Sequence, residues 1–133
     1  MWHTGRKYIS VRAALFYSAG VLYNMYRLLI VDDEQSIRSG IIKGNPWNEW
    51  GFEIVGDAAD GFEALRIIEQ TAPDVILSDI RMPNMDGIEL MQYVNKNYPQ
   101  IKMVILSGYS DFEYLNMSIK HHQECKIGCF YFI

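Results

Sequence analysis

The sequence has few cysteines and no long hydrophobic run, and each shortage excludes a class of protein. Its two cysteines, Cys125 and Cys129, are too few for the disulfide framework of a small secreted domain, so we expect a reducing compartment, the cytoplasm. Residues 13–23 follow three basic residues, as in a signal peptide, but this apolar run is interrupted by Ser18 and Gly20 and is too short to span a bilayer. We therefore expect neither export nor membrane insertion.

Basic residues are also scarce. The chain has 12 Lys and Arg against 16 Asp and Glu, a formal net charge of −4, and no basic stripe interleaved with aromatic residues. Such a chain has no general attraction to nucleic acid, so we expect no direct binding to DNA or RNA. With 133 residues, half of them hydrophobic, it has the size of one domain with one core.

The pattern divides the chain into an irregular start and a regular domain. Residues 1–24 are predicted to be an N-terminal appendage, because a regular order of apolar and capping segments begins only after Met25. The domain is predicted to cover residues 25–133. Its pattern is regular to about Lys120, and residues 121–133 form an atypical tail.

Strand and helix patterns alternate four times in this domain. Short apolar runs predict strands at 27–31, 52–56, 74–78 and 101–106. Helices are predicted after them at 36–43, 60–70, 86–98 and 110–120, three of them opened by a capping box in which Asp or Ser precedes Glu by three residues. The first helix is expected to bury Ile37, Ile41 and Ile42.

Alternation with short loops predicts an α/β fold with a doubly wound parallel sheet. The expected strand order is the flavodoxin-like 2-1-3-4-5, in which strands 1 and 3 are neighbours. The apolar run at residues 127–133 is a candidate for the fifth strand, but the pattern does not establish it, and no fifth helix is expected after it.

Acidic residues follow the first and third predicted strands, at the edge where an open α/β sheet binds its ligands. Asp32 and Asp33 end the first strand, Asp79 ends the third, and Ser107 ends the fourth. Two carboxylates about 4 Å apart repel by roughly 4 kcal/mol at an effective dielectric constant of 20, so the cluster favours a hard cation such as Mg²⁺. One carboxylate can then attack a phosphoryl group and form an aspartyl phosphate, with the Ser107 hydroxyl contacting a phosphoryl oxygen.

These residues at these spacings resemble the receiver domain of bacterial two-component response regulators, over residues 26–120. The matching positions are Asp32-Asp33, Asp79, the motif Met82-Pro83-x-x-Asp86-Gly87, and Ser107-Gly108. Residues 107–114 are similar to receivers that precede an AraC-type DNA-binding domain.

The resemblance implies roles for individual residues and a place in signal transduction. Asp79 would accept a phosphoryl group from a sensor histidine kinase. Asp33 would hold Mg²⁺ directly, Asp32 largely through water, and Arg81 through its backbone carbonyl, while Ser107 would be the switch hydroxyl. The resemblance further implies a phosphoprotein in transcription regulation that can form a homodimer, with no enzymatic activity beyond its own phosphorylation and dephosphorylation.

The chain departs from the family pattern after about Lys120. Receivers have a Lys followed by Pro at the end of the fifth strand, and no such pair occurs here. Lys126 precedes the apolar run instead of following it, so we do not assign it the role of the phosphate-contacting lysine. Weak coupling between phosphorylation and its read-out is therefore expected.

Two alternatives to a signalling receiver stay open. The first is a truncated receiver that no longer signals and serves only as a docking module. The second is a phosphohydrolase similar to the haloacid dehalogenases, but these have Asp-x-Asp after the first strand, whereas this chain has Asp32-Asp33-Glu34 and its candidate nucleophile follows the third.

Overall fold

The computed structural model describes residues 25–107 and 129–132. In order along the chain, the elements of this part are β1 (Tyr26–Val31), α2 (Gln35–Lys43), β2 (Phe52–Ala58), α3 (Gly61–Thr71), β3 (Val75–Asp79), α4 (Gly87–Asn97), β4 (Lys102–Ser107) and β5 (Cys129–Phe132). The predicted appendage at 1–24 and the predicted helix at 110–120 lie outside the described residues. No helix in the described ranges is both long and apolar enough to cross a bilayer.

The strands form one parallel sheet in the order β2-β1-β3-β4-β5, which confirms the predicted flavodoxin-like topology. The fifth strand, which the sequence left open, pairs with β4 from Val104↔Cys129 to Ser107↔Phe132. Because all strands run the same way, their carboxyl ends lie at one edge of the sheet.

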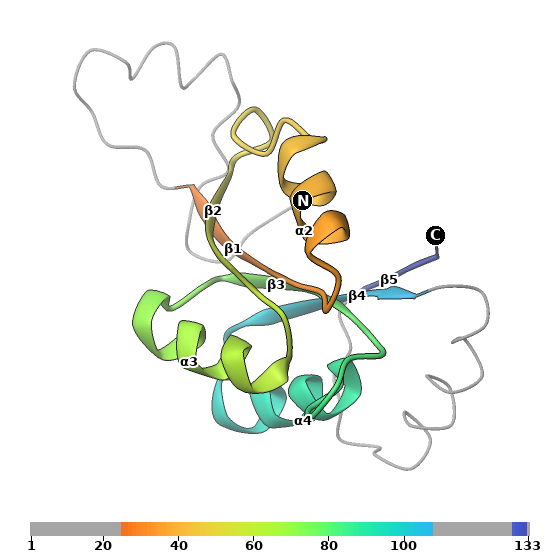
Figure 1. Cartoon of the computed structure of the whole chain (residues 1–133). Coiled ribbons are helices and arrows are strands. Elements are labelled where there is room, and N and C mark those ends of the chain that lie inside the picture. The colour runs from red at the N-terminus through yellow and green to blue at the C-terminus, as the bar shows by residue number, and fades with distance from the viewer. Residues whose placement is uncertain (1–24, 108–128, 133) are drawn as a thin grey trace.

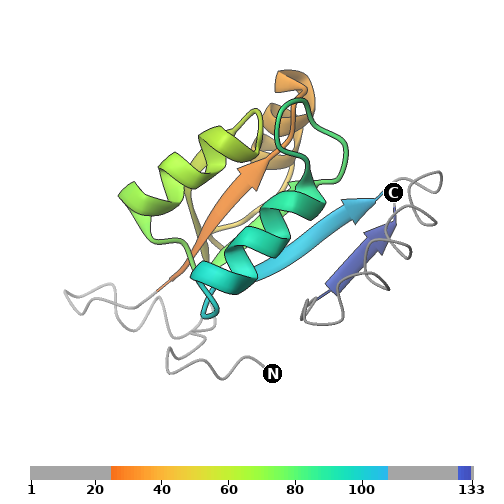
Figure 2. The same ribbon diagram turned by 90° about the horizontal axis from the view of Figure 1, so that it is seen from below.

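Alternate residues of β1 show how the two faces of the sheet are covered. Leu28 and Ile30 belong to a cluster that includes partly buried residues of α2, whereas Leu29 and Val31 belong to the larger core beneath α3 and α4. Figure 1 shows α2 on the opposite side of the sheet from α3 and α4, and Figure 2 shows α3 and α4 over the same face. The alternation is that of a strand covered on both faces, as the continuous apolar runs predicted.

Helix α2 covers its face of the sheet less closely than predicted. Ile41 and Ile42 are partly buried against the sheet, but Ile37 is 42% exposed, so its predicted burial is wrong. In this first turn the inward position is taken by Arg38, whose side chain is only 13% exposed and bonds to groups at the ends of β1 and β2. Neighbouring positions of a helix point about 100° apart, so Ile37 is turned toward solvent.

The predicted caps begin α3 and α4. The carboxylate of Asp60 accepts the amide N–H of Glu63 at 2.9 Å, and that of Asp86 accepts the amide N–H of Glu89 at 2.9 Å. The Glu63 carboxylate in turn accepts the N–H of Ala59 at 3.0 Å. These bonds satisfy amides at the helix starts that lack an intrahelical partner, and they fix the loops that follow β2 and β3.

Candidate metal and phosphoryl site

Three carboxylates meet where the neighbouring strands β1 and β3 end. Asp32 and Asp33 follow β1 directly, Asp79 is the last residue of β3, and the two strands pair as far as Val31↔Ser78. One potential ligand oxygen from each of the three lies within 4.8 Å of the other two. The structure therefore brings together three of the residues that the sequence selected as metal ligands.

Asp32 is the buried member of this cluster, with 5% of its surface exposed. Its Oδ1 atom accepts the backbone N–H of Glu34 at 2.9 Å. Loss of hydration by burial raises the pKa of Asp32, which the Glu34 amide opposes, while the negative charges of Asp33 and Glu34 raise it further and Arg38 lowers it. The net rise in pKa means that the surrounding groups do not fully offset the loss of hydration of the ionised Asp32 carboxylate.

Asp79 lies at the strand end in a partly exposed position. Its Oδ1 atom accepts the N–H of Ile80 at 2.8 Å, which orients the carboxylate. The hydroxyl of buried Ser78 donates to the carbonyl oxygen of Asp79 at 2.8 Å. Both the side chain and the backbone of the candidate acceptor are therefore held by neighbouring residues.

The loop after Asp79 folds back on the strand end at Gly87. The Gly87 N–H donates to the carbonyl of Ile80 at 2.7 Å. A Cβ atom on Gly87 would lie 2.1 Å from the carbonyl oxygen of Asp79, which is closer than two non-bonded atoms can approach. Glycine at this position therefore allows the start of α4 to approach the backbone of the candidate acceptor.

The same loop is bonded to the beginning of α3. Asn84 adopts a left-handed backbone conformation with φ of 66°, and its amide nitrogen donates to the Asp60 carboxylate at 3.1 Å. The Gly61 N–H donates to the carbonyl of Met85 at 3.1 Å. The Glu63 amide is the main cause that lowers the pKa of Asp60, and Asn84 adds to it. Sequence reasoning identified Asp60 only as a helix cap and missed this link.

The remaining predicted site residues lie at the same edge of the sheet. Arg81 is two residues past Asp79, in the loop before α4, with an exposed side chain. Ser107 ends β4, one residue beyond Leu106, which pairs with Asp79. The backbone thus puts Ser107 near the acidic cluster, while the predicted role of its hydroxyl concerns a side chain outside the described ones.

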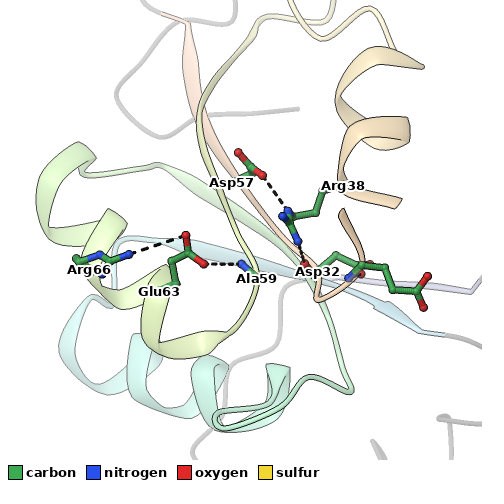
Figure 3. Close-up of polar contacts among 7 residues, drawn as sticks. Asp32, Arg38, Asp57, Ala59, Glu63 and Arg66 are labelled. Carbon is green, nitrogen blue, oxygen red and sulfur yellow. Dashed lines mark hydrogen bonds and ion pairs between the residues drawn. The ribbon is translucent and has the colours of Figure 1, made fainter. Parts of the chain in front are cut away.

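Sequence reasoning also missed a polar link on the other side of the cluster. The Arg38 guanidinium donates to the backbone carbonyl of Asp32 at 2.7 Å and to the Asp57 carboxylate at 2.8 Å, as Figure 3 shows. An arginine one helical turn after an acidic loop is a signal for such a contact. Asp57, however, lies beyond the predicted end of the second strand, so the sequence did not identify it as the partner of Arg38.

The donor set suits a hard divalent cation. It consists of oxygen ligands alone, with one buried and two more accessible carboxylates, and Mg²⁺ is typically bound by one or two carboxylates while it keeps several waters. A cation here would also offset the repulsion among the three charges. The residues present therefore fit Mg²⁺.

Comparison with known proteins agrees with this geometry. The family model of the response regulator receiver domain matches residues 28–124. The chain belongs to this family. Receiver domains are signalling domains that sensor histidine kinases phosphorylate, and they generally use Mg²⁺ at an acidic pocket. The expected resemblance is thus confirmed at the level of the family.

Among curated relatives, the transcriptional regulatory protein HptR of Staphylococcus aureus is 39% identical over 98 residues, which are 74% of this chain and 38% of HptR. An uncharacterised response regulatory protein of Staphylococcus epidermidis is 41% identical over 98 residues, with the same shares of the two chains. This receiver chain therefore spans about two fifths of the length of these curated relatives.

Solved receiver structures share the fold. The receiver domain of AraT, a response regulator from Geobacillus stearothermophilus, superposes with a TM-score of 0.72 at 35% identity and covers 81% of each chain. A two-component transcriptional regulator, AraC from Clostridium phytofermentans, gives a TM-score of 0.70 at 41% identity and covers 80% of each chain. Both names agree with the expected similarity to receivers of AraC-type regulators.

Proposed function

We propose that this receiver accepts a phosphoryl group on Asp79, with Mg²⁺ held by Asp33, by Asp79 and by the backbone carbonyl of Arg81. The observation that carries the proposal is the convergence of Asp32, Asp33 and Asp79 within 4.8 Å at the carboxyl ends of β1 and β3. Ser107 is the proposed switch hydroxyl, supported by its position at the end of the adjacent strand β4.

The proposed reaction is transfer of a phosphoryl group from the phosphohistidine of a sensor kinase. A carboxylate oxygen of Asp79 attacks phosphorus, and a P–O bond forms as the P–N bond breaks. The electron pair of the broken bond remains on the imidazole nitrogen, which takes up a proton. The Ile80 amide keeps the Asp79 carboxylate oriented during the attack.

Burial separates the roles of the two acidic residues after β1. Asp33 is exposed and can contact a cation directly, whereas Asp32 is buried and one of its oxygens is already bonded to the Glu34 amide. This difference supports direct binding by Asp33 and binding largely through water by Asp32. When bound, Mg²⁺ would offset the negative charge of the phosphoryl oxygens and of the cluster.

The proposed biological role is signalling, with a sensor histidine kinase as the partner. The chemistry assigned to the chain is limited to its own phosphorylation and dephosphorylation, so we do not propose that it is an enzyme for other substrates. Regulation of transcription, a homodimer, a cytoplasmic location and the absence of direct nucleic-acid binding belong to the same proposal. They rest on the family and on the acidic composition.

Labelling tests the acceptor directly. The 133-residue chain and its Asp79→Asn variant are incubated with a radioactive small phosphodonor, with Mg²⁺ or with EDTA. On the parent with Mg²⁺ we expect protein-bound label that both hot acid and base release, as from an acyl phosphate. The label should fall at least about tenfold in Asp79→Asn, which lacks the nucleophile, and in EDTA, which removes the cation. Equal labelling of both chains would contradict the proposal. An unlabelled but folded parent would favour the non-signalling docking module.

A further inference from the structure

A positive charge lies next to the proposed cation site, where it would repel a bound Mg²⁺. The Arg38 guanidinium is 2.7 Å from the carbonyl oxygen of Asp32, so it adjoins the cluster at which Mg²⁺ would bind. Two cations at short range repel, and repulsion is stronger where water is largely excluded. With only 13% of its side chain exposed, Arg38 is in such an environment, so its charge alone would weaken Mg²⁺ binding.

The contacts of Arg38 point to a geometric effect on the metal site that opposes this repulsion. It begins in the first turn of α2 and reaches the loop after β1 at Asp32 and the end of β2 at Asp57 (Figure 3). The N–H groups of a guanidinium form a planar fork, so two bonds to separate acceptors fix the relative positions of those acceptors. Arg38 therefore joins three elements around the acidic loop.

Backbone bonds extend this link to the carboxylate of Asp32. The Asp32 N–H donates to the carbonyl of Ala58 at 3.0 Å, so the residue is bonded to the end of β2 on its amino side and to Arg38 on its carbonyl side. The Glu34 N–H then holds its Oδ1 atom at 2.9 Å. Loss of Arg38 would free the peptide between Asp32 and Asp33, the two residues that must face the cation.

We infer that Arg38 is a positioning residue that orders the Asp32–Asp33 segment for Mg²⁺, and that its geometric effect on metal affinity outweighs its electrostatic repulsion. The inference rests on the proposed Mg²⁺ site. The inference predicts the direction in which a substitution of Arg38 changes the affinity for Mg²⁺. Removal of Arg38 weakens Mg²⁺ binding if it acts by position, but strengthens binding if its charge is what matters.

The test compares Arg38→Gln with Arg66→Gln in the 133-residue chain. The control loses the same charge from a side chain that is 67% exposed and pairs with Glu63 at 3.9 Å, away from the three acidic residues. Mg²⁺ alone is titrated, and its dissociation constant is read from backbone amide NMR signals of the folded chain at 25 °C. Unfolding in EDTA is measured separately, because a merely structural role would change stability without changing the affinity of the folded state.

We expect Arg38→Gln to bind Mg²⁺ about tenfold more weakly than the parent, at the lower end of losses for residues that orient metal ligands. Arg66→Gln should stay within about twofold, because exposed charges are screened. Equal or tighter binding by Arg38→Gln would overturn the inference while the metal site stands. A parent with no response to Mg²⁺ would instead overturn the proposed site, and the inference with it.

A second variant covers the case in which Arg38→Gln does not fold. Arg38→Lys keeps the charge, but a single ammonium on a shorter side chain cannot reproduce the guanidinium fork that contacts both Asp32 and Asp57. We expect at least about threefold weaker Mg²⁺ binding than in the parent, on the same geometric grounds. Unchanged affinity would show that the guanidinium contacts with Asp32 and Asp57 do not affect the metal site, and would overturn the inference.

Discussion

Asp32 combines charge and burial in a way that no other described member of the acidic cluster does. It is 5% exposed, and burial is the first cause of its raised pKa. An ionised carboxylate in this position lowers the stability of the metal-free fold. This is expected of a site in which a bound cation offsets the cost of the buried charge.

This condition predicts that Asp32→Asn stabilises the metal-free chain at neutral pH. Asparagine retains an oxygen that can accept the Glu34 amide, but it carries no charge to desolvate. Because the folded-state pKa of Asp32 lies above its unfolded-state value, the folded chain binds more protons between the two values, and the contribution of Asp32 to the unfolding free energy falls as the pH rises through that range.

The advantage of Asp32→Asn should therefore be full at pH 7 and disappear as the pH falls toward 3.8, the ordinary value for Asp. Thermal unfolding in EDTA across this pH range measures it, with Glu69→Gln, an exposed change of the same charge on α3, as the control. A variant less stable than the parent at pH 7, or an advantage that grows on acidification, would contradict the electrostatic account.

At the scale of elements, the loop between β3 and α4 is held by backbone contacts that involve the starts of α4 and α3. Gly87 lies against the Asp79 carbonyl, and the Gly61 N–H bonds to the Met85 carbonyl. The starts of two helices therefore hold the loop that follows the candidate acceptor Asp79. A change at either helix start is expected to shift the end of β3.

Gly87→Ala should destabilise the fold by about 1–3 kcal/mol, the usual range for added bulk in a packed site. The new methyl group would meet the Asp79 carbonyl oxygen at 2.1 Å and the Ile80 Cα atom at 3.1 Å, and these backbone atoms cannot move aside as the end of a flexible side chain can. Urea unfolding measures the loss. An unchanged urea midpoint would show that the close approach of α4 to Asp79 is wrong.

Gly40→Ala is the matched control for the glycine substitution. Gly40 lies inside α2, and a Cβ atom there would meet nothing within 4 Å. Alanine should therefore raise stability by about 0.5–1 kcal/mol through its better helix propensity. The same chemical change is thus expected to have opposite signs at Gly40 and Gly87.

At the scale of the whole molecule, the sheet and its acidic edge could be predicted from the sequence. Continuous apolar runs such as 28–31 identify buried strands, and capping pairs such as Asp60 and Glu63 mark helix starts. Parallel pairing then brings Asp32 and Asp79 together without knowledge of any side-chain contact. These features depend on local pattern and on topology alone.

The features that could not be predicted depend on how side chains are oriented across elements. Both Ile37 and Arg38 suit the first turn of a helix, and only packing on the sheet decides that Arg38 turns inward. The Asn84–Asp60 bond joins two loops that are 24 residues apart in sequence. No periodicity specifies such a contact.

The central claim, that Asp79 is the acceptor in a cluster that needs a cation, is tested most directly by locating the phosphoryl group. The 133-residue chain is incubated with acetyl phosphate and Mg²⁺, and any acyl phosphate is reduced with borohydride, which converts a phosphorylated aspartate into homoserine. After digestion, mass spectrometry should find homoserine at position 79 alone, and not after incubation in EDTA. Homoserine at position 32 or 33, or an equal yield at 79 in EDTA, would contradict the account.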